Sequence, residues 1–190
     1  MDKIRTIKNV ITPDDAKLII DYIDKNLRFF NPTPGLKRFT KMFGKDVAHQ
    51  HMSKVVVEGL DDITDLIKDT VDNVKKTLAY QFSDTDDILL TSLWFAKQRP
   101  GGDIKGHLDI DGGLNTHFVY SAVLYLNTIQ DGGELDFPML NVSIKPELGD
   151  LVVFPSSGED MFHEVKRIGE DRYTLPMWFT KDKGFELTFK

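Results

Sequence analysis

Three polar side chains, His107, Asp109 and Asp111, recur at every second position of the segment KGHLDIDGG, residues 105–113. Alternate side chains of a β-strand share one face, so His107 and Asp109 can point at one atom together. Asp111 lies two residues further toward the following turn, and we expect it to cap that turn or to support the site indirectly. Taken alone, the His-x-Asp triplet is better explained by a hydrogen-bonded surface histidine, because a chain this rich in Asp produces one by chance.

A further histidine, His163, begins the segment HEVKRIGEDRYTLPMWF. If residues 168–171 form a four-residue hairpin loop, His163 lies opposite Pro176. Arg172 is then roughly 13 Å along the sheet from the level of His163, at about 3.3 Å per residue. That separation leaves room for one short ligand with a charge at its far end. Directly opposed residues share a face, which in this register carries His163, Arg172, Thr174 and Trp178.

The candidate metal ligands are two histidines and one carboxylate: His107, Asp109 and His163. Such a set fills three positions around a metal ion and leaves the others open, which is the arrangement of non-haem Fe(II) oxygenases. A structural zinc site would usually be closed by a fourth protein ligand. Because the chain has no cysteine, thiolate metal sites, disulfides and cysteine nucleophiles are excluded.

Length and composition predict one globular domain over residues 1–190, since 41% of the residues are hydrophobic. The net charge of -6 gives no general attraction to polyanions, so nucleic acid is not an expected partner. The N-terminus has no apolar signal core, and no apolar run approaches membrane-spanning length. We therefore expect a soluble, cytoplasmic protein with no membrane partner.

Helical patterns are confined to the first 87 residues, which we expect to form helical support and a long loop. Thr12 and Pro13 predict the start of a helix whose buried side carries Leu18, Ile19, Tyr22, Ile23 and Leu27. A second helix is predicted over about residues 60–81. Residues 29–56, rich in basic and phenylalanine side chains, are predicted to be a loop that is either a substrate lid or an irregular crossover.

From residue 88 the pattern changes to short apolar or alternating segments separated by turn signals. Two helices followed by many short strands predict a mainly β fold, an antiparallel sandwich or barrel with the helices packed on one sheet. The jelly-roll catalytic core is expected over residues 88–190. The predicted strands are residues 88–97, 104–110, 117–127, 133–137, 141–145, 150–154, 161–167, 172–180 and 185–189.

Several spaced motifs resemble those of Fe(II)/2-oxoglutarate-dependent dioxygenases, and more closely those of the prolyl 4-hydroxylase-like group. They are His107-x-Asp109, Tyr125-Leu-Asn127 followed by Gly132-Gly133-Glu-Leu, the segment KPELGDLVVFP at residues 145–155, His163, and Arg172-Tyr-x-Leu-x-x-Trp178-Phe. The resemblance covers roughly residues 88–190. It implies a double-stranded β-helix, or jelly roll, which agrees with the strand count.

The resemblance also implies a role for each site residue. His107, Asp109 and His163 would bind Fe(II), and Arg172 would pair with the C5 carboxylate of the cosubstrate 2-oxoglutarate, assisted by Tyr125 and Thr174. Lysine could match that carboxylate only as a point charge. The reaction would consume O2, with ascorbate as a supporting reductant. Trp178, Gln98 and Arg99 are expected at the substrate pocket.

The expected activity is hydroxylation of an unactivated C–H bond, with release of succinate and CO2, and the expected substrate is a peptidyl proline. Against proline, Gln98 and Arg99 stand near the position where many prolyl hydroxylases carry a pocket tyrosine. Nucleobase demethylation is disfavoured because its enzymes are expected to carry a second arginine where this chain has Trp178. A small-molecule or other amino-acid hydroxylase, and a non-catalytic jelly-roll binding module, remain alternatives.

Overall fold

The computed structural model describes residues 3–26, 47–53, 63–85, 87–110 and 115–189. Two antiparallel β-sheets form most of this part of the chain. The larger sheet has the strand order β1 (Arg5–Ile7), β8 (Leu151–Pro155), β5 (Tyr120–Tyr125), β10 (Arg172–Thr180), β3 (Leu89–Gln98) and β2 (Val47–Ser53). The smaller sheet has the order β4 (Ile104–His107), β9 (His163–Val165), β6 (Leu135–Phe137) and β7 (Val142–Ile144).

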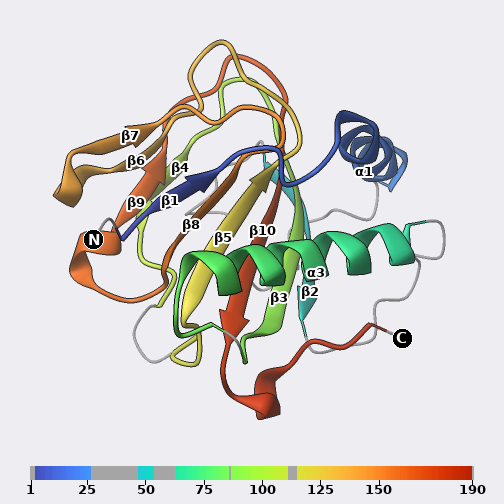
Figure 1. Ribbon diagram of the computed structural model, residues 1–190. Coiled ribbons are helices and arrows are strands. Elements are labelled where there is room, and N and C mark those ends of the chain that lie inside the picture. The colour runs from blue at the N-terminus through green and yellow to red at the C-terminus, as the bar shows by residue number, and fades with distance from the viewer. Residues whose placement is uncertain (1–2, 27–46, 54–62, 86, 111–114, 190) are drawn as a thin grey trace.

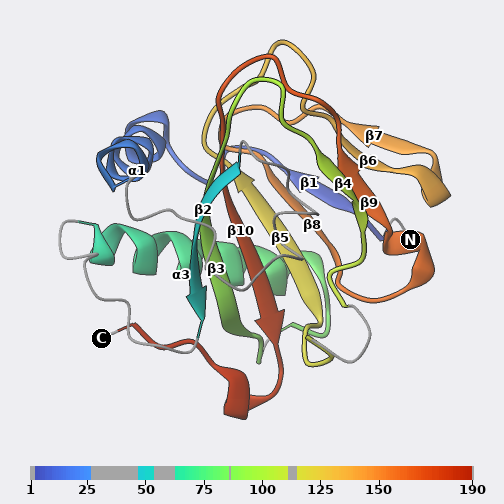
Figure 2. The same ribbon diagram turned by 180° about the vertical axis from the view of Figure 1, so that it is seen from behind.

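Two helices, α1 (Pro13–Asn26) and α3 (Thr64–Gln81), cover one face of the larger sheet, and the smaller sheet lies on its other side (Figures 1 and 2). Short 3-10 turns are η2 (Pro138–Leu140), η3 (Glu159–Met161) and η4 (Lys183–Phe185). This arrangement confirms the predicted mainly β jelly roll with N-terminal helices packed on one sheet. No described helix combines the length and the apolar character needed to cross a bilayer.

The first helix begins where its sequence predicts. The hydroxyl of Thr12 accepts a hydrogen bond from the backbone amide of Asp15 at 3.1 Å, which satisfies one of the free amides at a helix start. Ile19, Tyr22 and Ile23 are buried as expected. The prediction that Leu18 is buried is wrong, because this residue is 54% exposed. Leu27 lies outside the described residues.

Hydrophobic side chains form two separate clusters, one on each face of the larger sheet. The first packs α1 and α3 against the sheet and includes Tyr173, Leu175 and Met177 of β10. The second lies between the two sheets and includes Phe137 and Phe154. Because strand side chains alternate, Arg172, Thr174, Pro176 and Trp178 of β10 are directed to the space between the sheets.

Three predicted elements differ from the structure. The hairpin expected across residues 168–171 does not exist, because β9 pairs with β4 and β6 while β10 pairs with β3 and β5 of the other sheet. Residues 185–189 form η4 and extended chain rather than a strand. Within the expected loop 29–56, residues 47–53 form β2, which pairs with β3; the other residues of that loop lie outside the described part.

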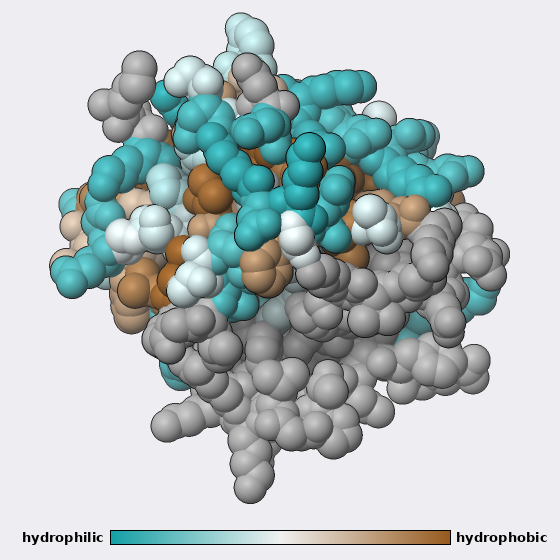
Figure 3. All heavy atoms as spheres, turned by 90° about the horizontal axis from the view of Figure 1, so that it is seen from below, coloured by the Kyte–Doolittle hydropathy of each residue, from teal (hydrophilic) through white to brown (hydrophobic). Residues whose placement is uncertain are grey.

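The described side chains on the face shown in Figure 3 are mainly hydrophilic, with apolar residues in small separate groups. Such scattered apolar residues are ordinary for a protein surface.

Candidate metal and anion site

The two candidate histidine ligands come from neighbouring strands of the smaller sheet. His107 ends β4, His163 begins β9, and the two residues are register partners. Asp109 follows two residues after His107, and one potential ligand atom from each of the three lies within 4.8 Å of the others. The Asp109 Oδ1 atom is 3.6 Å from His107 Nε2 and 3.9 Å from His163 Nε2. These separations exceed a hydrogen bond but suit donors that each lie about 2.0–2.2 Å from a shared metal ion.

Backbone carbonyl groups set the orientation of both imidazole rings. The Nδ1 atom of His107 lies 2.9 Å from the carbonyl oxygen of Lys105, and that of His163 lies 2.9 Å from the carbonyl oxygen of Met161. A carbonyl oxygen only accepts hydrogen bonds, so each Nδ1 carries the proton and donates it. The lone pair of each neutral ring is then on Nε2, the atom directed toward Asp109.

The charges of the three groups are matched to cation binding. Burial would raise the pKa of Asp109, but His163 and His107 outweigh it and lower the pKa to about 2, with a further contribution from Ser121. Burial lowers the pKa of His163, so this ring is neutral at neutral pH. Burial also lowers the pKa of His107, but Asp109 more than compensates and the net shift is upward. One carboxylate and two imidazoles are therefore available to a divalent metal ion.

A buried arginine lies on the facing sheet. Arg172 opens β10, is 3% exposed, and is the register partner of Gln98 on β3. Its Nη1 atom donates a hydrogen bond to the Gln98 side-chain oxygen, and its Nη2 atom donates to the Tyr125 hydroxyl at 3.2 Å. The guanidinium carbon is 4.9 Å from the centre of the Tyr125 ring. Thr174, the register partner of Tyr125, is fully buried.

Several polar atoms around Arg172 lack hydrogen-bond partners in the described part of the chain. They are the Nε atom of Arg172, the hydroxyl of Thr174 and the amide nitrogen of Gln98. No described carboxylate forms an ion pair with Arg172 either. Since buried polar groups are normally hydrogen-bonded and buried charges paired, this set of donors fits a carboxylate brought by a ligand. The donor set thus suits one carboxylate, such as the distal carboxylate of 2-oxoglutarate, and the triad suits a divalent metal ion such as Fe(II).

The residues expected at the substrate pocket divide into two groups. Trp178 is half-buried, with its ring centre 5.0 Å from that of Trp94 and 5.8 Å from that of Phe118. Gln98 is buried beside Arg172. Arg99 follows Gln98 in the chain but is exposed beyond the end of β3, whereas Gln98 and Arg172 are buried.

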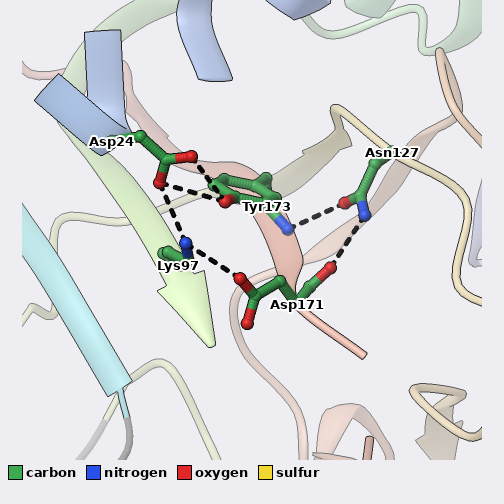
Figure 4. Close-up of polar contacts among 5 residues, drawn as sticks. All are labelled: Asp24, Lys97, Asn127, Asp171 and Tyr173. Atoms are coloured by element: carbon green, nitrogen blue, oxygen red, sulfur yellow. Dashed lines mark hydrogen bonds and ion pairs between the residues drawn. The ribbon is translucent and has the colours of Figure 1, made fainter. Parts of the chain in front are cut away.

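A polar cluster on the helix side of the larger sheet was not found from the sequence. It consists of Asp24, Lys97, Asn127, Asp171 and Tyr173, and we call it the Lys97 cluster (Figure 4). Lys97 lies 2.9 Å from both Asp24 and Asp171, and Asp24 accepts a hydrogen bond from the Tyr173 hydroxyl at 2.9 Å. The Asn127 side chain accepts from the amide of Tyr173 and donates to the carbonyl of Asp171, both at 2.8 Å.

The Lys97 cluster holds the backbone on both sides of Arg172, since Asp171 and Tyr173 are its chain neighbours. The sequence did carry one signal for it, because Asn127 belongs to the Tyr125-Leu-Asn127 motif. The contacts to Lys97 and Asp24 join residues far apart in the chain, and no local pattern indicates them.

Residues 93–180 match the sequence model of a family described as the 2OG-Fe(II) oxygenase superfamily. Prolyl 3-hydroxylase 2 of Mus musculus is 41% identical to this chain over 69 residues, which are 33% of this chain and 10% of the mouse protein. The chain therefore corresponds to a small part of that relative.

Solved structures share the fold over nearly the whole chain. A Pseudomonas putida prolyl-4-hydroxylase has a TM-score of 0.65 and 23% identity, covering 95% of this chain and 93% of that one. A Trichoplax adhaerens prolyl hydroxylase, solved with a hypoxia inducible factor oxygen degradation domain peptide fragment, has a TM-score of 0.73 and 18% identity, covering 96% and 86%.

The family match and the fold together define the class: the chain resembles the Fe(II)/2-oxoglutarate-dependent dioxygenases. Among them, the named relative and structural neighbours are prolyl hydroxylases, so the resemblance to prolyl hydroxylases expected from the sequence motifs is confirmed.

Proposed function

We propose that this protein is an Fe(II)/2-oxoglutarate-dependent dioxygenase that hydroxylates a peptidyl proline. In the overall reaction, 2-oxoglutarate, O2 and a C–H bond are converted to succinate, CO2 and an alcohol. One observation carries the proposal: a His–Asp–His triad at the smaller sheet faces a buried arginine of the larger sheet. This arginine forms no ion pair with a described carboxylate. Fe(II), when bound, would supply the redox chemistry that couples oxidation of the cosubstrate to that of the substrate.

The chain's own residues would bind, orient and exclude water. His107, Asp109 and His163 would hold the metal ion through Nε2, a carboxylate oxygen and Nε2. On the other sheet, Arg172 would pair with the distal carboxylate of 2-oxoglutarate, and Tyr125 and Thr174 would offer hydroxyl groups to it. Burial of these groups strengthens their interaction with a carboxylate because little water competes. Residues 88–190 would form the catalytic core, and the preceding helices would support its larger sheet.

Proline as the substrate is supported by two lines of argument. The relatives and structural neighbours named above are prolyl hydroxylases. The aromatic group of Trp178, Trp94 and Phe118 offers apolar ring surface, which suits the uncharged face of a pyrrolidine ring and gives no charge to a phosphate backbone. We propose oxidation at the 4-position of the ring, and the 3-position is the alternative suggested by the mouse relative.

The test uses the purified protein with Fe(II), ascorbate, 2-oxoglutarate and matched peptide libraries with and without proline. We expect succinate together with a mass increase of about 16 Da, one oxygen atom, on proline-containing peptides only. Chromatography of the hydrolysed product separates 3-hydroxyproline from 4-hydroxyproline. Hydroxylation that ignores proline, or occurs only on a free metabolite, would remove the prolyl assignment and keep the dioxygenase. Absence of both metal binding and succinate formation would favour a non-catalytic binding module.

A further inference from the structure

The side chain of Gln98 is 1% exposed and is directed at Arg172 from the neighbouring strand. Its oxygen accepts a hydrogen bond from Arg172 Nη1. Arginine offers only donors, so the carboxamide must turn its oxygen toward the guanidinium, and its NH2 group forms no hydrogen bond with Arg172. That NH2 group has no hydrogen-bond partner among the described residues.

The described protein partners that orient Arg172 carry no charge. Gln98 and Tyr125 both accept hydrogen bonds from the guanidinium without neutralising it. Glutamate at position 98 has nearly the same shape as glutamine and could accept the same hydrogen bond, but it would form an ion pair. A carboxylate ligand would then meet an arginine whose charge is already balanced, so glutamine in place of glutamate preserves the attraction for the ligand.

The amide nitrogen of Gln98 shares a carbon with the oxygen that contacts Arg172, so it lies close to the guanidinium. A carboxylate bound to Arg172 has two oxygens with several lone pairs. A single arginine cannot donate hydrogen bonds to all of them. The NH2 group of Gln98 and the hydroxyl of Thr174, both without a hydrogen-bond partner among the described residues, are donors that can fill them, beside the Tyr125 hydroxyl.

We propose that Gln98 is a determinant of cosubstrate specificity: it orients Arg172 as a neutral acceptor and donates its NH2 group to the distal carboxylate of the cosubstrate. Gln98 thereby selects 2-oxo acids that carry a second carboxylate over those that do not. This assignment moves Gln98 from the substrate pocket to the anion site, and it rests on the proposed function because the anion is 2-oxoglutarate.

The test compares Gln98→Glu and Gln98→Met by calorimetric titration of the Mn(II)-loaded protein with 2-oxoglutarate and with 2-oxovalerate, which lacks the distal carboxylate. Gln98→Met removes the hydrogen bonds, and we expect 2-oxoglutarate to bind about tenfold more weakly. Gln98→Glu also balances the charge of Arg172, and we expect a loss of about a hundredfold or more. Binding of 2-oxovalerate should change little in either variant. The ratio of the affinity for 2-oxoglutarate to that for 2-oxovalerate should therefore fall in both.

Thermal unfolding of the metal-free variants separates this role from a structural one. Gln98→Glu gives Arg172 a counter-ion, so its melting temperature should equal or exceed that of the wild type although it binds the ligand worst. Gln98→Met should melt lower. A residue needed only for packing would instead lose stability and binding together in both variants.

Gln130→Glu is the matched control, because it is the same chemical change at an exposed position. It should leave binding of both 2-oxo acids unchanged. If wild-type protein fails to bind 2-oxoglutarate, the proposed function is wrong. If wild type binds but Gln98→Glu binds equally well, the function stands and the role of Gln98 is wrong.

Discussion

His107 and His163 are register partners on adjacent antiparallel strands, with ring centres 4.3 Å apart. Two rings so close, each oriented by a backbone carbonyl at Nδ1, present their Nε2 atoms to the same carboxylate, that of Asp109. We expect His107→Ala, Asp109→Ala and His163→Ala each to abolish binding of Mn(II), followed by electron paramagnetic resonance, because two ligands hold an ion poorly. Circular dichroism should remain near that of the wild type.

The companion variant for that experiment is Asp111→Asn. Asp111 follows the same alternate spacing, but lies outside the described residues. We expect Asp111→Asn to keep Mn(II) binding and turnover. Loss of metal binding in this variant would show that the wrong aspartate was chosen as the ligand.

Metal binding should weaken as the pH falls. The pKa of Asp109 is near 2 and that of His163 is below its ordinary value, so neither group competes strongly with the metal near neutral pH. The pKa of His107 is above its ordinary value of 6.5, so this ring takes up a proton first. In metal-free protein the raised pKa of His107 stabilises the fold below pH 6.5, and this contribution is lost as the pH rises through the folded-state pKa.

Mn(II) titrations between about pH 6 and 8 measure this dependence. The affinity should be nearly constant above the raised pKa of His107 and should fall as the pH is lowered through that pKa. A flat profile across that interval would mean that His107 does not bind the metal as a neutral ring.

Arg172→Lys tests the anion anchor. Lysine keeps the positive charge but loses the planar pair of donors, so the apparent affinity for 2-oxoglutarate should fall about tenfold or more while Mn(II) affinity stays near normal. Thr174→Val should weaken 2-oxoglutarate binding by about 0.5 to 1.5 kcal/mol, the size of one ordinary hydrogen bond. Titration with 2-oxoglutarate reports both, and unchanged affinity in Arg172→Lys would locate the anchor elsewhere.

Lys97→Met should lower the free energy of unfolding by about 1 to 3 kcal/mol at neutral pH. The Lys97 side chain is 9% exposed, but the side chains of Asp24 and Asp171 are 44% and 42% exposed, so solvent screens much of the interaction. Burial opposes the charged form of Lys97, yet contacts with Tyr173, Asp171 and Asp24 raise its pKa above 10.5. This stabilisation is therefore present below pH 10.5 and is lost as the pH rises through the folded-state pKa.

Urea unfolding of wild type and Lys97→Met at neutral and at strongly alkaline pH measures both effects. Asp21→Asn, which breaks the exposed pair between Lys17 and Asp21 on α1, is the control and should change stability by less than about 0.5 kcal/mol. Equal losses in the two variants would mean that the Lys97 cluster contributes no more than a surface ion pair.

The parts of this site that could be predicted from sequence are those that depend on local spacing. The alternate positions of His107 and Asp109 follow from strand geometry, and the orientation of Arg172 and Thr174 to one face follows in the same way. The pairing of β9 with β10 was wrong because a short connection between strands indicates a hairpin, whereas here the chain crosses from one sheet to the other. The Arg172–Gln98 contact joins residues 74 positions apart, and no local pattern encodes it.

The division of the site between two sheets has a mechanical consequence. The candidate metal ligands belong to the smaller sheet and its edge, and Arg172 belongs to the larger sheet. Each sheet has its own hydrogen bonds, so a ligand that contacts both sites must match the distance between the two sheets. Phe137 and Phe154 pack against each other in the cluster between the sheets, with ring centres 5.0 Å apart, so their bulk contributes to the distance between the two layers. A smaller side chain at either position would change the distance between the sheets, and with it the length of ligand that fits, without altering any group that touches the ligand. The hydrophobic core therefore influences ligand length as well as stability.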